Sequence, residues 1–175
     1  MAPARKRGPA AALGLAAALA LAACAHFGGL RPYYGPIPGS ISFLLGAPED
    51  SVIIAAARVV DSAGLQVAVY DPSEGYLETK WYDLGTRRTV GDGARDLDRI
   101  VKLRFFGGPV ARYSRLWVEC VRRIAVDPSE PERSLERMVP DRSPGRVLLD
   151  SIAAKLQARY PPPGGAAPAG PAAKP

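Results

Sequence analysis

The stretch LQVAVYDPSEGYLETKW, residues 65–81, decides the fold of this chain. Residues 65–70 alternate apolar and other side chains with the two-residue period of a half-buried strand. Residues 71–75 combine Asp, Pro, Ser and Gly, which favour a tight turn. Residues 76–82 alternate again, and on one face we expect Leu77, Thr79 and Trp81. The stretch therefore predicts a β-hairpin.

A helix is expected directly before this hairpin, over residues 48–63. Pro48 suits a first helical turn, and the acidic side chains of Glu49 and Asp50 favour the positive end of the helix dipole. The apolar residues that follow have helical spacing: Val52, Ala55, Ala56, Val59, Val60 and Ala63. Gly64 is a natural residue to end such a helix.

Two more strands and a second helix are expected after the hairpin. Residues 99–106 and 113–126 alternate, and the second of these strands has an expected inward row of Leu116, Val118, Cys120 and Ile124. Ser143 and Pro144 suit the start of a helix that ends before the proline run at 161. The expected fold is an α+β two-layer sandwich over residues 44–160, in the order α-β-β-β-β-α. Its four-stranded antiparallel sheet carries both helices on one face.

The N-terminus has the parts of an export signal in the usual order. Cations at residues 5–7 precede an apolar segment at residues 10–20, which is too short to span a bilayer as a helix. The run Leu21-Ala22-Ala23-Cys24 that follows resembles the lipobox of bacterial lipoproteins. The resemblance implies cleavage before Cys24, which would then carry diacylglycerol and an N-acyl chain such as palmitate. The alternative is an ordinary secretory signal cut after Ala23, with Cys24 incidental.

The signal changes what the charge implies. Residues 1–23 hold three of the 23 Lys and Arg and none of the 17 Asp and Glu, so a net charge of +6 becomes 20 minus 17, or +3. Such a modest excess on an exported protein excludes nucleic acid as an expected partner. Residues 24–43 are rich in Gly and Pro and predict a flexible tether, and residues 161–175 predict a disordered Pro/Ala/Gly tail.

The first helix and the hairpin also resemble a known domain. Residues 48–82, with the strand that begins Tyr76-Leu77-Glu78-Thr79, are similar to the BamC-like helix-grip domain of barrel-assembly lipoproteins. The residue after the expected anchor is Ala25 and not the Asp that favours inner-membrane retention of lipoproteins in many enteric bacteria. By that analogy we expect the inner leaflet of an outer membrane, facing the periplasm.

The sequence offers no residues for catalysis or metal binding. His26 is the single histidine and lies in the expected tether, away from any group that could orient it. Cys120 falls on an inward strand position and is expected to be a buried apolar group. Asp92 and Asp96 lie in a Gly-containing segment that lacks the ligand spacing of a calcium loop. We therefore expect a non-enzyme without cofactor, apart from the acyl chains on Cys24.

The face of the sheet opposite the helices is the candidate interaction surface. The expected outward residues are Lys102, Arg104, Arg115, Trp117 and Arg123. They predict either an ordinary solvated face or a docking surface for an acidic envelope protein or an anionic envelope polymer. The expected function is a non-enzymatic assembly or interaction module. The alternative is a periplasmic small-ligand or lipid-binding lipoprotein, with its cavity between the helices and the sheet.

Overall fold

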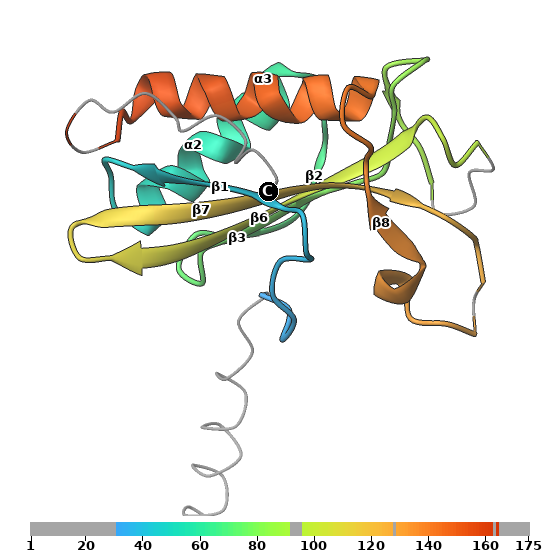
Figure 1. Ribbon diagram of the computed structural model, residues 1–175, viewed down its shortest axis with the longest axis horizontal. Coiled ribbons are helices and arrows are strands. Elements are labelled where there is room, and N and C mark those ends of the chain that lie inside the picture. Colours follow the sequence, from blue (N-terminus) through green and yellow to red (C-terminus); the bar gives the residue numbers. More distant parts are fainter. Residues whose placement is uncertain (1–30, 92–95, 128, 163, 165–175) are drawn as a thin grey trace, which may run out of the picture.

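The computed structural model describes residues 31–91, 96–127, 129–162 and 164, and has an α+β fold with two helices on one side of a sheet (Figure 1). The predictions for residues 1–23, Cys24, His26 and Asp92 lie outside the described residues. In chain order the elements are β1 (Ile41–Leu45), α2 (Glu49–Ser62), β2 (Val67–Asp71), β3 (Tyr76–Thr79), β4 (Tyr82–Asp83), β5 (Arg88–Thr89), β6 (Ile100–Val110), β7 (Tyr113–Arg123), the 3₁₀ turn η1 (Glu132–Leu135), β8 (Glu136–Met138) and α3 (Pro144–Arg159).

The sheet has eight strands, and the predicted number of four is wrong. Its main order is β1-β7-β6-β3-β2, with antiparallel pairing throughout, so the four predicted strands are present as β2, β3, β6 and β7. The additional strands β4, β5 and β8 have two or three residues each, which is too short for alternation to be recognised. Strand β1 has five residues, and its first three fall in the Gly- and Pro-rich stretch that was predicted to be a tether. The outer edge of β7 is divided between β1, opposite residues 114–118, and β8, opposite residues 121–123.

Both predicted helices are confirmed, with the expected ends. Helix α2 begins directly after Pro48, and Gly64 follows it with a φ of 81°, a conformation that costs glycine little. Helix α3 begins at Pro144, and the Ser143 hydroxyl accepts a hydrogen bond from the backbone N–H of Arg146 at 3.2 Å. In the described part of the chain, neither helix is long and apolar enough to cross a bilayer.

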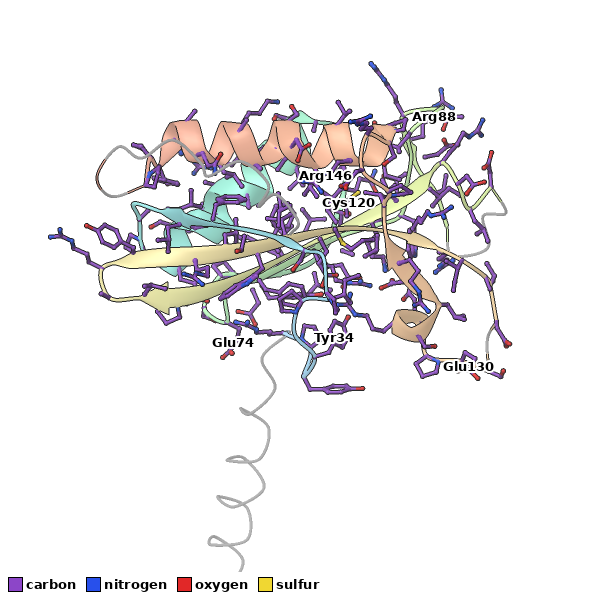
Figure 2. All side chains as sticks on the ribbon, in the orientation of Figure 1. Tyr34, Glu74, Arg88, Cys120, Glu130 and Arg146 are labelled. Atoms are coloured by element: carbon purple, nitrogen blue, oxygen red, sulfur yellow. The ribbon has the colours of Figure 1, made fainter. Side chains whose placement is uncertain are left out.

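The core lies between the helices and one face of the sheet. Its strand residues include Leu77, Leu103, Phe105, Leu116 and Val118, and they meet the buried side chains of Val52, Ile53, Ala56, Leu149, Ile152 and Leu156. Cys120 lies in this core beneath α3, as predicted (Figure 2). Ile124 was expected in the same inward row but is 46% exposed, because β7 ends one residue earlier, at Arg123.

A bulge between β3 and β4 reverses the side chain of Trp81. Glu78 pairs with Arg104 and Tyr82 pairs with Val101, so three residues of this edge lie opposite two residues of β6. The extra residue shifts the alternation by one position. Trp81 therefore packs on the sheet face away from the helices, and the prediction that it shares a face with Leu77 is wrong.

Thr79 satisfies the backbone group that this bulge leaves without a ladder partner. Its hydroxyl oxygen accepts a hydrogen bond from the N–H of Leu103 at 3.0 Å, and the side chain is fully buried. A buried backbone donor without an acceptor would be costly, so a hydroxyl at this position supports the irregular edge.

Residues 31–40 lie against the sheet face opposite the helices, and they do not form the free tether predicted for residues 24–43 (Figure 1). The Arg31 guanidinium donates to the carbonyl oxygens of Glu74 at 2.9 Å and Gly107 at 3.0 Å. The backbone N–H of Ile37 donates to a carboxylate oxygen of Glu119 at 2.7 Å. Residues 41–43 belong to β1, so the described part of the predicted tether is packed against the domain from Arg31 onward.

Candidate functional site

The sheet face opposite the helices holds a cluster of paired charges, which we call the charge network. Its members are Glu78, Lys102, Arg104, Glu119, Arg123, Glu132, Arg133 and Glu136. Four carboxylates and four cations balance in this set. Residues 31–40 and η1 lie over it from outside the sheet (Figure 1).

Arg104 is the centre of the charge network and is only 2% exposed. Two of its nitrogens, Nη1 and Nη2, donate to the two carboxylate oxygens of Glu136 at 2.5 and 2.7 Å, and its Nε donates to Glu78 at 2.8 Å. Burial works against the charged form, but the hydrogen bonds and charge of Glu136 and the charge of Glu78 raise the pKa of Arg104 above its usual value. The planar guanidinium group of Arg104 thus connects β6 to β3 through Glu78 and to β8 through the paired hydrogen bonds to Glu136.

Glu119, on β7, holds two covering segments at once. Its two oxygens accept hydrogen bonds from Arg133 of η1 at 2.5 and 2.6 Å, and one of them also accepts from the N–H of Ile37. The guanidinium groups of Arg104 and Arg133 lie 5.9 and 4.6 Å from the centroid of the Tyr34 ring. Figure 2 shows Tyr34 on the side of the sheet away from the helices.

The Glu132 carboxylate accepts hydrogen bonds from three side chains. We call these three the acceptor site, because together they hold a carboxylate: Trp81, Lys102 and Arg123. The indole Nε1 of Trp81, the Nζ of Lys102 and an Nη2 of Arg123 reach the same oxygen, Oε1, at 2.9, 3.1 and 2.9 Å. Both cations also lie over the Trp81 ring, at 4.7 and 4.4 Å from its centroid. Burial acts to raise the pKa of Glu132, but these donors outweigh it and lower the pKa to about 2.

Glu132 lines two open cavities. The first, of about 380 Å³, is lined by Arg123, Ala125, Val126, Asp127, Glu130, Glu132 and Leu135. The second, of about 340 Å³, is lined by Ala68, Lys80, Trp81, Val90, Gly91, Lys102 and Glu132. Neither cavity is lined by a described residue of α2 or α3, so neither corresponds to the predicted alternative of a cavity between helices and sheet.

The five residues of the predicted interaction surface do not form one surface. Lys102, Arg104 and Arg123 are 5%, 2% and 8% exposed and belong to the charge network, so the prediction that they face solvent is wrong. The physical reason is the cover formed by residues 31–40, η1 and β8, which alternation within single strands does not reveal. Glu78 and Glu119 carried a usable signal, because both lie on outward strand positions next to Arg104.

Arg115 and Trp117 remain accessible, near the end of the β6–β7 hairpin. Arg115 is exposed and lies 5.9 Å from the Trp117 ring centroid, and Trp117 is half-buried. Arg112 and Tyr113 repeat this pairing at the tip, with 5.1 Å between the guanidinium and the ring. We call these four residues the hairpin surface. The tip lies at the end of the sheet away from β8 (Figure 1).

The remaining chemically active side chains are accounted for by packing. Burial raises the pKa of the Cys120 thiol well above its usual value, which favours the unreactive protonated form. Asp96 forms an ion pair with Arg99 at 2.9 Å. Within the described ranges, no three His, Cys, Asp or Glu side chains are grouped as metal ligands.

The charge network predicts a large difference between two arginines of the same sheet face. We expect Arg104→Met to lower the free energy of unfolding by about 3–5 kcal/mol, because it leaves buried carboxylates without their cation. Arg115→Met is the matched control and should change it by no more than about 0.5 kcal/mol. Urea unfolding followed by circular dichroism measures both, and equal losses would contradict the network.

Acid should weaken the fold through Glu132 and Glu78, whose pKa values are both lowered in the folded state. The unfolded chain then binds more protons than the folded one, so stability is complete above the ordinary pKa of 4.5 and falls as the pH drops toward 2. Thermal unfolding at pH 7 to 2 should show this loss. Glu132→Gln should make the unfolding temperature depend less steeply on pH, whereas Glu130→Gln, in the same loop, should leave this dependence as in the wild type.

No model of a known protein family matches this chain, and no curated protein sequence matches it. The resemblances to a lipoprotein signal and to the BamC-like helix-grip domain therefore stay predictions. What the described residues can do is argued from their own geometry and charge.

Proposed function

We propose that this chain is a lipid-anchored, non-enzymatic interaction module of the cell envelope that docks an acidic envelope protein through its hairpin surface. The observation that carries the proposal is the accessible pairing of two arginines with two aromatic rings at the projecting end of β6 and β7. Arg, Tyr and Trp are the side chains that most often dominate binding energy at protein interfaces.

The shape and charge of the hairpin surface support docking of an acidic partner. Residues 106–117 contain two arginines and no acidic residue. The Trp117 ring lies against Gly108, where a Cβ atom would be 3.0 Å from ring atom Cζ3, so the glycine allows the ring to lie flat on the strand. A flat aromatic ring beside exposed cations suits a partner with carboxylates at the rim of its contact surface.

The lipid anchor supplies the location. If Cys24 is acylated, seven residue steps separate it from Arg31, and these span at most about 25 Å when fully extended. This is much shorter than the predicted tether of residues 24–43, because residues 31–40 are attached to the sheet. The proposed position is the inner leaflet of the outer membrane, with the domain facing the periplasm.

Cys24→Ser should abolish both labelling by a palmitate analogue and sedimentation with membranes, because the acylated sulfur is removed. Cys120→Ser is the matched control, since this buried thiol should contribute neither lipid nor membrane attachment. Metabolic labelling and membrane fractionation measure the two effects. A Cys24→Ser chain that still carries the label would refute the anchor.

A photo-crosslinking residue in place of Arg112 should capture an acidic envelope protein in intact cells, whereas the same residue in place of Val147 should not. Val147 is 63% exposed and lies on α3, on the opposite side of the sheet. Capture should fall at least about tenfold on adding Arg115→Glu and Trp117→Ala, since charge and ring are both lost. Capture that is equal at both positions, or indifferent to these changes, would rule out docking at this hairpin.

A further inference from the structure

Strand β1 leaves one of its two edges without a neighbour among the described strands. It stands at the end of the sheet order, and all five of its residues pair with β7 on the other side. Backbone N–H and C=O groups along an unpaired edge are a template for a further strand. This edge is therefore a place where an extended segment of another molecule can be added.

Strand β1 also lacks the features that usually protect a sheet edge. Residues 32–48 contain no charged side chain, β1 contains no proline, and its five pairs with β7 run without a register shift. The opposite edge, β2, has a register shift between Val67 and Val69 and ends at Asp71. Strand β8 has only three residues, two of them charged. Charges, prolines, bulges and short length all hinder strand addition, so of these three edges β1 is the one open to it.

The side chains along β1 favour a segment that is apolar on one face. Ile41 and Phe43 lie on the helix side of the sheet, where both pack against the core but are only partly buried. Leu44 lies on the other face and is half-buried. Apolar side chains of an added strand would cover Ile41 and Phe43, because paired residues of neighbouring strands lie side by side on the same face.

The other face of the sheet beside β1 carries cations that no described carboxylate neutralises. Arg115 lies directly opposite Leu44 in the strand register, and Arg112 lies just beyond the start of β7. Each contacts an aromatic ring, and neither forms an ion pair with a described residue. A residue added opposite Leu44 would be two strand spacings from Arg115, or roughly 10 Å, which extended Arg and Glu side chains bridge together. The edge therefore suits a segment with carboxylates on this face.

We propose that the acidic partner docks by adding an extended segment to the free edge of β1, with apolar side chains over Ile41 and Phe43 and acidic side chains toward Arg115. In this mode main-chain hydrogen bonds supply affinity, and the alternate side chains supply specificity. A second copy of the chain suits the edge less well, because its own β1 has no acidic side chain for Arg115. The proposal rests on the proposed function, since it specifies how the same partner binds beside the hairpin surface.

The test is a titration of the purified full chain with a synthetic peptide in which Val and Glu alternate, followed in ¹H–¹⁵N spectra. We expect the backbone signals of β1 to shift and that of Val69, on the opposite edge, to stay unchanged. The same peptide with Lys in place of Glu should bind at least about tenfold more weakly, because its charge is reversed. A Val/Glu peptide N-methylated throughout should also lose at least about tenfold in affinity, because it has no N–H groups to pair with the edge.

Charge reversal on the protein gives a matched pair of variants. Arg115→Glu should weaken binding of the Val/Glu peptide at least about tenfold and strengthen binding of the Val/Lys peptide. Arg58→Glu, on the exposed face of α2, should change neither affinity. Equal affinities for the three peptides, or shifts confined to β2, would overturn the proposal. Sedimentation of the chain alone as a dimer joined through β1 would assign the edge to a second copy and would also overturn it.

Crosslinking in cells separates this proposal from the proposed function. A photo-crosslinking residue in place of Ser42, which is exposed on β1, should capture the same acidic protein as one in place of Arg112. The captured segment, identified by mass spectrometry, should alternate apolar and acidic residues. The same residue in place of Ala68, exposed on β2, should capture nothing. Capture at Arg112 without capture at Ser42 would overturn strand addition and leave docking at the hairpin surface intact, whereas no capture at either position would contradict both.

Discussion

The buried guanidinium of Arg104 is the constraint on which this structure depends. A cation that is 2% exposed must be matched by carboxylates at hydrogen-bond distance, and Glu136 and Glu78 provide that match from β8 and β3. Glu119 then carries the pairing outward to Arg133 and to the backbone of Ile37. Two segments that are far apart in the sequence, residues 31–40 and η1–β8, thereby become fixed to one face of the sheet. A charged cluster here performs the role that apolar packing performs on the helix side.

The bulge after Thr79 links this cover to the acceptor site. Without the extra residue Trp81 would face the helices, and Lys102 and Arg123 would have no ring to lie against. Thr79 stabilises the irregular edge in its buried position, because its hydroxyl oxygen accepts a hydrogen bond from the backbone N–H of Leu103. A local backbone irregularity thus decides which chemical groups meet on the second face, which is a common use of bulges in functional sheets.

The sequence predicted those features that depend on one segment at a time. The hairpin of β2 and β3, the two helices with their ends, and the burial of Cys120 follow from period, turn residues and caps, and the structure confirms them. The strands β4, β5 and β8 are too short for a period, and β1 begins within the Gly- and Pro-rich stretch that was predicted to be a tether. The reversal of Trp81 needs the register of two strands together. The burial of Lys102, Arg104 and Arg123 depends on segments 30 or more positions away or across a loop, such as Glu136 for Arg104. Alternation shows which face a side chain takes, but not what covers that face.

Outward side chains are buried at one end of β6 and β7 and exposed at the other, because these strands extend beyond the segments that cover them. Each has 11 residues, whereas β3 has four and β1 has five. Near Arg104 this face is covered by residues 31–40 and η1, so outward charged side chains are buried and form ion pairs. Beyond Gly107 no described segment covers this face to a similar extent, and outward residues such as Arg115 and Trp117 are accessible to solvent. Strands β6 and β7 therefore contribute residues both to the buried acceptor site around Glu132 and to the exposed hairpin surface. Whether an outward residue is buried or exposed depends on whether a neighbouring segment covers its position on the strand.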